Sequence, residues 1–145
     1  MMRDKYPDFA RLAAENHEGR DYVIEICERA SGVAVLAPHG GGIEPGTSEL
    51  ARAIAGEDFS LYLFEGVREA NNQDLHISST RFDEPRCLEL VARSGVVLGV
   101  HGCRERQALV FAGGRDTRLR DRLDAALANL GIRVDANHAE IAGKW

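Results

Sequence analysis

Residues 32–55 read GVAVLAPHGGGIEPGTSELARAIA, and this stretch decides the fold. Its first part, 32–37, is a short continuous apolar run, which is typical of a β-strand covered on both faces. The following residues, 38–46, are rich in Pro and Gly and predict a tight loop. Residues 47–55 have helical spacing, with Thr47 as the predicted N-cap. A strand, a glycine-rich loop and a helix in this order indicate an α/β protein.

Strands and helices alternate along the rest of the chain. The periodicity of apolar residues predicts helices at 8–16, 84–93 and 116–130 and strands at 21–29, 60–64, 76–80, 96–100, 108–112 and 131–134. We therefore expect a three-layer α/β domain with a mixed, mostly parallel sheet. The strands at 21–29 and 32–37 are close enough in sequence to predict a hairpin between them.

Composition excludes several classes of protein. The 145 residues carry a formal net charge of -5, so no basic face for nucleic acid is expected. No apolar stretch approaches the roughly 18 residues of a membrane span. Residues 1–9 also lack the apolar stretch of a secretory signal. We expect a single domain, 1–145, located in the cytoplasm, with its 3 cysteines reduced.

Two histidines follow apolar strands at positions where a ligand can approach. His39 comes after the strand at 32–37 and His101 after the strand at 96–100, and glycine follows each of them. Polar residues beyond the carboxyl ends of strands gather in one crevice of an open α/β sheet. Together with Glu44, they offer the two imidazoles and the carboxylate of a catalytic zinc site. The spacing leaves open that the histidines are separate loop residues bonded to the backbone.

Four motifs occur in order along the chain: APHGGGIEPGTSELA, LYLFEG, LHISSTRFDEP and VHGC. In these motifs and their order, the sequence resembles the phage-derived poly-γ-glutamate hydrolase family. The resemblance covers residues 22–144, nearly the whole chain. It implies a compact relative of the zinc carboxypeptidases that hydrolyses γ-glutamyl amide bonds within the polymer. By this resemblance, His39, Glu44 and His101 are the zinc ligands.

Metal-assisted amide hydrolysis also needs a base, donors to the oxyanion and groups that hold the substrate. His76 is predicted as a catalytic residue that donates to the oxyanion or orients a ligand, with a structural role as the alternative. Arg81 and Arg115 are predicted to bind the free α-carboxylates of poly-γ-glutamate. The alternatives are an ion pair of Arg81 with Asp83 or Glu84, and a position for Arg115 at the start of the helix 116–130.

Two further residues near predicted strand ends have open roles. Glu65, which follows the strand at 60–64, either supports the site or is a solvated loop acid. Cys103 lies two residues after His101 and could act as a nucleophile. A zinc site is the preferred interpretation, because the same imidazole would otherwise have to serve both zinc and the thiol.

The C-terminal sequence departs from the family pattern. The general base of the family lies in a Gly-Val-Gln-Leu-Glu stretch, downstream of the segment that here reads HAEIAGK, and this chain contains no Gln-Leu-Glu. Glu140 is the acidic residue considered as a substitute. We expect the last strand and its base to be missing, which exposes a sheet edge that a second copy can pair with. Two functions stay open: a zinc-dependent γ-glutamyl hydrolase, or a catalytically weak relative that binds an anionic polymer.

Overall fold

The structure is a computed structural model that describes residues 4–104 and 107–135. The chain divides into two compact units, Met1–Cys103 and Arg104–Trp145. Within the described residues, the first unit contains a four-stranded sheet and the second a two-stranded sheet. No helix among these residues is long and apolar enough to cross a membrane.

The four-stranded sheet is mixed and mostly parallel, as the sequence predicts. Its strands are β1 (Tyr22–Cys27), β2 (Val33–Gly41), β3 (Ser60–Gly66) and β4 (Val96–Gly99), in the order β1-β3-β2-β4. β2 runs parallel to both β3 and β4, whereas β1 is antiparallel to β3. The central β2 is buried over most of its length, which explains its continuous apolar sequence.

The predicted hairpin between the first two strands is wrong. β1 pairs with β3, so that β3 lies between β1 and β2. β1 contains the charged Glu25, and most of the strand is only half-buried, which suits an outer position. β2 and β3 are apolar on both faces and occupy inner positions. The burial of these two strands therefore decides the order, rather than proximity in sequence.

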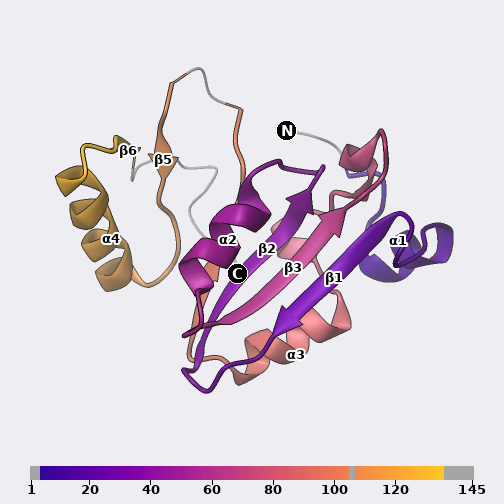
Figure 1. Cartoon of the computed structure of the whole chain (residues 1–145), viewed down its shortest axis with the longest axis horizontal. Helices are drawn as coiled ribbons and strands as arrows, with labels where there is room; N and C mark the ends of the chain where they lie inside the picture. The colour runs from indigo at the N-terminus through magenta and orange to yellow at the C-terminus, as the bar shows by residue number, and fades with distance from the viewer. Residues whose placement is uncertain (1–3, 105–106, 136–145) are drawn as a thin grey trace. The chain divides into compact units, whose positions relative to one another are not determined.

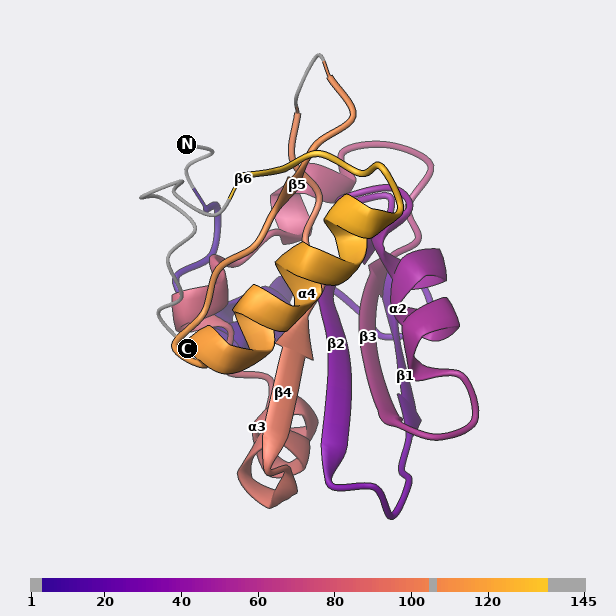
Figure 2. The ribbon, with the colours of Figure 1, turned by 90° about the vertical axis from the view of Figure 1, so that its left-hand side faces the viewer.

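Helices cover both faces of this sheet and complete three layers, with α2 and α3 on opposite sides of the strands (Figures 1 and 2). On one face lies α2 (Thr47–Ala55), whose Ala51 packs in a core with Leu63. On the other face lie α1 (Phe9–Glu15) and α3 (Pro85–Arg93), whose Leu12 and Leu90 share a core with Phe64. The predicted three-layer α/β architecture is confirmed.

Carboxylate side chains cap α1 and α3. Asp8 accepts a hydrogen bond from Arg11 N–H at 2.8 Å, and Glu84 accepts one from Cys87 N–H at 2.9 Å. The N-cap predicted for Thr47 is wrong, because Gly46, with a φ of 94°, takes that position. The Thr47 hydroxyl instead donates to the Glu44 carbonyl oxygen at 2.8 Å, which ties α2 to the glycine-rich loop.

The strand predicted at 76–80 is also wrong. This segment runs between two 3₁₀ helices, η1 (Asn72–Leu75) and η2 (Ser79–Arg81). Side chains take the backbone groups that a strand would pair: the Ile77 carbonyl oxygen accepts from His39 Nε2 at 2.7 Å, and Ser78 N–H donates to Asp4 at 2.8 Å. The Ile77 side chain is buried in the core. Ile77, the apolar residue that suggested a strand, therefore holds a loop against the core.

The second unit contains β5 (Val110–Phe111), α4 (Thr117–Asn129) and β6 (Val134–Asp135), and its two strands are parallel. Asp116 caps α4 by accepting a hydrogen bond from Leu119 N–H at 2.9 Å. The helix predicted at 116–130 is confirmed. The strand predicted at 108–112 is shorter in the structure, and the one predicted at 131–134 begins only at Val134.

Candidate metal centre

Three side chains that could bind a metal ion meet at the carboxyl ends of β2 and β4. His39 lies near the end of β2, Glu44 lies in the loop before α2, and His101 follows β4. β2 and β4 are parallel neighbours, so their carboxyl ends share one edge of the sheet. One ligand atom from each residue lies within 4.8 Å of the others. The structure thus brings together the three residues predicted as zinc ligands.

The distances between the ligand atoms fit a tetrahedral zinc ion. His39 Nδ1 lies 3.4 Å from Glu44 Oε1 and 3.3 Å from His101 Nδ1. His101 Nδ1 lies 3.8 Å from Glu44 Oε2. Zinc bonds of about 2.0–2.1 Å at tetrahedral angles separate two ligand atoms by about 3.3 Å. The three side chains therefore have nearly the spacing that a zinc ion requires.

Hydrogen bonds determine which nitrogen of His39 faces the centre. Nε2 lies 2.7 Å from the Ile77 carbonyl oxygen, so it carries the proton and donates. Nδ1 then presents its lone pair to Glu44 and His101. On His101, Nε2 lies 3.2 Å from Ser79 Oγ, and Nδ1 faces His39. This donor set, with each imidazole held through its other nitrogen, is typical of a metal site.

Glu44 is held as a carboxylate. Burial raises its pKa, but the neighbouring His101 and His39 rings and the hydrogen bond from the Gly102 N–H outweigh burial and keep the pKa well below its ordinary range. The Gly102 N–H donates to Glu44 Oε2 at 2.8 Å. The carboxylate is therefore charged and oriented, as a metal ligand must be.

The glycines between His39 and Glu44 are required by close packing against the end of β3. Gly41 has a φ of 60°, and a Cβ there would lie 2.5 Å from the Gly66 carbonyl oxygen. A Cβ on Gly42 would lie 2.4 Å from Asn72 Nδ2. Only glycine permits both approaches. They let the loop fold back so that Glu44 N–H donates to the His39 carbonyl oxygen at 2.9 Å.

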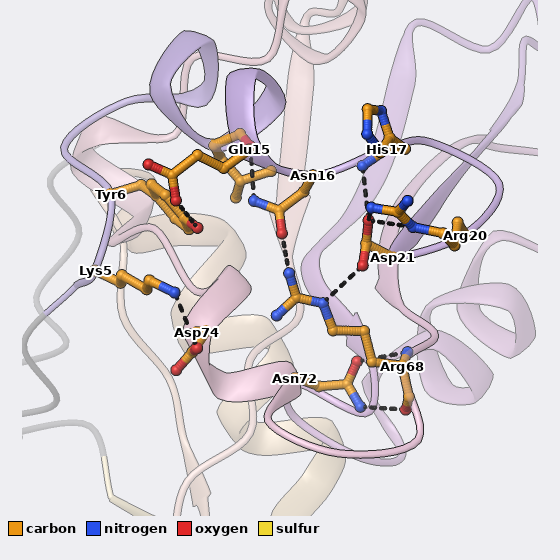
Figure 3. A network of polar contacts seen from close by, with 11 residues as sticks. Lys5, Tyr6, Glu15, Asn16, His17, Arg20, Asp21, Arg68, Asn72 and Asp74 are labelled. Carbon is orange, nitrogen blue, oxygen red and sulfur yellow. Dashed lines mark hydrogen bonds and ion pairs between the residues drawn. The ribbon is translucent and has the colours of Figure 1, made fainter.

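A polar network holds Asn72 in place beside this loop (Figure 3). Arg68 N–H donates to Asn72 Oδ1 at 3.0 Å, and Asn72 Nδ2 donates to the Arg68 carbonyl oxygen at 2.8 Å. The Arg68 guanidinium also donates to Asn16, which follows α1, and to Asp21, which precedes β1 (Figure 3). The network joins the segment between α1 and β1 to the segment after β3, and Asn72 of the second segment lies against the glycine-rich loop.

His76, predicted as a catalytic residue, lies beside the three candidate ligands. Its ring stacks on the His39 ring with centroids 4.1 Å apart, and its Nε2 lies 3.9 Å from Glu44 Oε1. Its Nδ1 lies 2.7 Å from Asp4 Oδ1. Burial, followed by the neighbouring His39, lowers the pKa of His76, and Asp4 opposes this shift. The position is compatible with catalysis, which stays a prediction.

Arg81 belongs to the same segment as His76. Its guanidinium pairs with Asp4 rather than with Asp83 or Glu84, and its side chain is half-exposed. The ion-pair alternative thus has a different partner from those that the sequence suggested. Substrate binding by Arg81 stays a prediction.

The four remaining residues that the sequence singled out are not among the three candidate ligands. Arg115 is exposed and precedes α4 in the second unit. Glu140 lies outside the described residues. Glu65 accepts from Arg52 at 3.1 Å and lies against the glycine-rich loop, and its supporting role stays a prediction. Cys103 is exposed, as a free thiol.

Two residues that contact the histidines of this region could not be predicted from the sequence. Asp4 contacts His76 across 72 positions, and Ser79 contacts His101 across 22. Neither pair has a recognisable spacing. Both contacts arise because the segment after η1 is a loop, whereas the sequence predicts a strand.

Comparison with known proteins assigns the chain to a family. Residues 6–144 match the model of the poly-gamma-glutamate hydrolase family. YndL of Bacillus subtilis (strain 168) is 46% identical over 113 residues, which cover 78% of this chain and 44% of YndL. The SPbeta prophage-derived protein YoqZ of the same organism is 39% identical over 135 residues, which cover 93% of this chain and 48% of YoqZ. The chain spans about half the length of these relatives.

Solved structures have the same fold. A bacteriophage poly-gamma-glutamate hydrolase matches with a TM-score of 0.94 and 30% identity, over 98% of this chain and 70% of that one. The zinc-free apo form of YndL matches with a TM-score of 0.88 and 39% identity, over 96% of this chain and 69% of that one. With its zinc-carboxypeptidase-like fold, the chain belongs to the poly-gamma-glutamate hydrolase family.

Proposed function

We propose that this chain carries the metal centre of a zinc-dependent hydrolase that cleaves γ-glutamyl amide bonds in poly-γ-glutamate. The observation that carries the proposal is the convergence of His39 Nδ1, His101 Nδ1 and the Glu44 carboxylate at separations of 3.3 to 3.8 Å. Family membership supports the reaction class. A zinc-free form of the relative YndL supports the choice of metal. Both units, 1–145, would belong to this one hydrolase domain.

The roles of the residues follow from their contacts. Zinc would supply a Lewis acid that polarises the amide carbonyl and makes water more acidic. His39 and His101 would bind it through Nδ1, and Glu44 would bind it as a carboxylate. Glu44 also accepts from Gly102 N–H and lies beside both imidazoles, so it suits a ligand better than a general base. Glu140 is the proposed substitute for the base of the family.

Substrate binding would depend on local positive charge. Poly-γ-glutamate presents a free α-carboxylate at each residue, whereas the chain has a net charge of -5. We assign carboxylate binding to Arg81 and Arg115. Asp4 engages only part of the half-exposed Arg81 guanidinium, which has five N–H donors. The remaining donors can bind a carboxylate in two places at once.

A second candidate function is a binding module for an anionic polymer. The sequence contains no Gln-Leu-Glu, the stretch that carries the general base in the family pattern. General-base assistance is worth about 10²- to 10⁴-fold in rate. A zinc centre without that base would therefore bind the polymer and cleave it slowly.

Metal analysis and a cleavage assay on the same samples test the proposal. We expect about one zinc per chain and a loss of polymer length for the wild type, and loss of both for His39→Ala. His17→Ala is the matched control, because His17 is exposed and only its backbone N–H contacts Asp21. Zinc binding without cleavage would support the binding module. Absence of zinc from the folded wild type would contradict the zinc-dependent hydrolase and the assignment of the three ligands.

A further inference from the structure

The carboxylate of Asp4 is buried at one end of the candidate metal centre. Only 1% of its side chain is exposed. It accepts hydrogen bonds from Ser78 N–H at 2.8 Å and from the Arg81 guanidinium, and it lies 2.7 Å from His76 Nδ1. All three partners belong to one short segment of the chain, and Asp4 is far from them in sequence.

These contacts determine where the proton of His76 resides. Burial raises the pKa of Asp4, but hydrogen bonds from Ser78 and His76 outweigh burial, so the pKa is lowered. An ionised carboxylate has no proton to donate, so the hydrogen bond between Asp4 and His76 needs the proton on Nδ1. Nε2 of a neutral His76 then carries a lone pair. A hydrogen bond from this neutral tautomer to an oxyanion is excluded, since Nε2 can only accept.

The same nitrogen faces the candidate ligands. Nε2 lies 3.9 Å from Glu44 Oε1, which is too long for a hydrogen bond. Among the described residues, no hydrogen bond to this nitrogen is formed. Stacking on His39 holds the plane of the ring. The ring is therefore fixed at one nitrogen and on one face, while its second nitrogen points to the centre.

We propose that Asp4 is a positioning residue that holds His76 with an unprotonated Nε2 beside the metal centre, where it accepts a hydrogen bond from a substrate amide N–H. The substrate part of this inference rests on the proposed function. The position of the proton does not, because it follows from the contacts of Asp4 alone. His76 would then be a substrate-binding residue, and Asp4 would act through it.

Nitrogen-15 NMR of the histidine side chains tests the position of the proton directly. Long-range proton–nitrogen spectra distinguish the two neutral tautomers, and His76→Gln assigns the signals of His76. The spectra are recorded on the zinc-free and the zinc-loaded protein, well above the ordinary histidine pKa of about 6.5. We expect His76 of the wild type to carry its proton on Nδ1 in both. A proton on Nε2 would overturn the inference without any variant.

Asp4→Asn provides a second test. Asparagine has one side-chain oxygen, which Ser78 N–H and Arg81 would occupy, so its NH₂ would face His76 Nδ1 and move the proton to Nε2. Asp74→Asn is the matched control, because Asp74 is an exposed carboxylate that pairs with Lys5 of the same N-terminal segment (Figure 3). We expect the tautomer to change in Asp4→Asn and not in Asp74→Asn. An unchanged tautomer in Asp4→Asn would overturn the inference.

Zinc content and kinetics separate this inference from the proposed function. Asp4→Asn should keep about one zinc per chain, because Asp4 contacts none of the three candidate ligands. Its kcat/KM should fall about 10- to 100-fold, as for residues that orient a group at a metal site. A changed tautomer with unchanged kcat/KM would overturn the role of His76 toward the substrate. A wild type that has the Nδ1 proton and zinc but no cleavage would overturn the proposed function and leave the positioning of His76 by Asp4 in place.

Discussion

Gly41 has no room for a methyl group unless the backbone of the glycine-rich loop moves. Its φ is 60°, and an added Cβ would lie 2.5 Å from the Gly66 carbonyl oxygen. We expect Gly41→Ala to lower the free energy of unfolding by about 2 kcal/mol or more, because the loop must move and the backbone is strained. Urea unfolding measures the change.

Gly95→Ala is the matched control for this substitution. The nearest atom to a Cβ at Gly95 is the Gly32 carbonyl oxygen at 3.7 Å, and the backbone there needs no positive φ. We expect a change within about 0.5 kcal/mol. Equal effects of the two substitutions would contradict the close packing of the glycine-rich loop against β3.

Asp21 gives the residue-scale prediction for pH. Its hydrogen bond with His17 N–H, and then that with Arg20, lower its pKa from 3.8 to about 2. The folded state therefore holds this proton more weakly than the unfolded state. The resulting stabilisation is fully present above pH 3.8 and is lost as the pH falls to about 2. Asp21→Asn should be less stable than the wild type near neutral pH, with a difference that shrinks over this range.

Unfolding by urea at a series of pH values measures that difference. Asp58→Asn, a substitution of an exposed carboxylate in the turn after α2, is the control and should stay close to the wild type throughout. A difference between Asp21→Asn and the wild type that stays constant down to pH 2 would contradict the ion-paired state of Asp21 in the Arg68 network.

At the scale of elements, the start of α3 depends on a buried carboxylate. Glu84 accepts from Cys87 N–H and from the Tyr62 hydroxyl, both at 2.9 Å, and from Arg86 Nε at 2.8 Å. Only 2% of its side chain is exposed. Glu84→Gln should lower the free energy of unfolding by about 2 kcal/mol, because three charge-assisted hydrogen bonds weaken at once.

Glu89→Gln is the control on the same helix. The Glu89 side chain is 69% exposed, and its ion pair with Arg93 is a surface contact at 3.9 Å. We expect a change within about 0.5 kcal/mol in thermal or urea unfolding. An equally small change in the free energy of unfolding for Glu84→Gln would contradict the role of this carboxylate in joining α3 to β3.

The elements also show what could be predicted from the sequence. The spacing of apolar residues predicted α1, α2, α3 and α4, because such residues recur along one side of each helix. Polar residues beyond the carboxyl ends of parallel strands gather in one crevice, which predicted that His39, Glu44 and His101 lie together. The structure has β2 and β4 as parallel neighbours. Two features were not predicted. The position of β3 between β1 and β2 depends on how deeply whole strands are buried. The loop at His76 depends on contacts with side chains distant in sequence, such as that of Asp4. No local pattern contains either kind of information.

At the scale of the whole molecule, charge shapes how a polyanion would bind. The chain carries a net charge of -5, so long-range forces would repel poly-γ-glutamate, while the proposed zinc ion and arginines would attract it locally. Added salt screens the long-range part first, since the Debye length is about 10 Å at 0.1 M. We expect the affinity of zinc-loaded protein for the polymer to stay constant or to rise with salt in fluorescence titrations. A collapse of affinity would contradict recognition through the zinc ion and individual arginines.

Binding of zinc is the most direct test of the centre itself. An isotherm for the wild type, His39→Ala and His17→Ala separates the candidate ligands from an ordinary surface histidine. We predict one zinc per chain for the wild type and for His17→Ala, and loss of stoichiometric binding for His39→Ala while the fold is kept, as judged by circular dichroism. Equal zinc binding by the wild type and His39→Ala would contradict the centre formed by His39, Glu44 and His101.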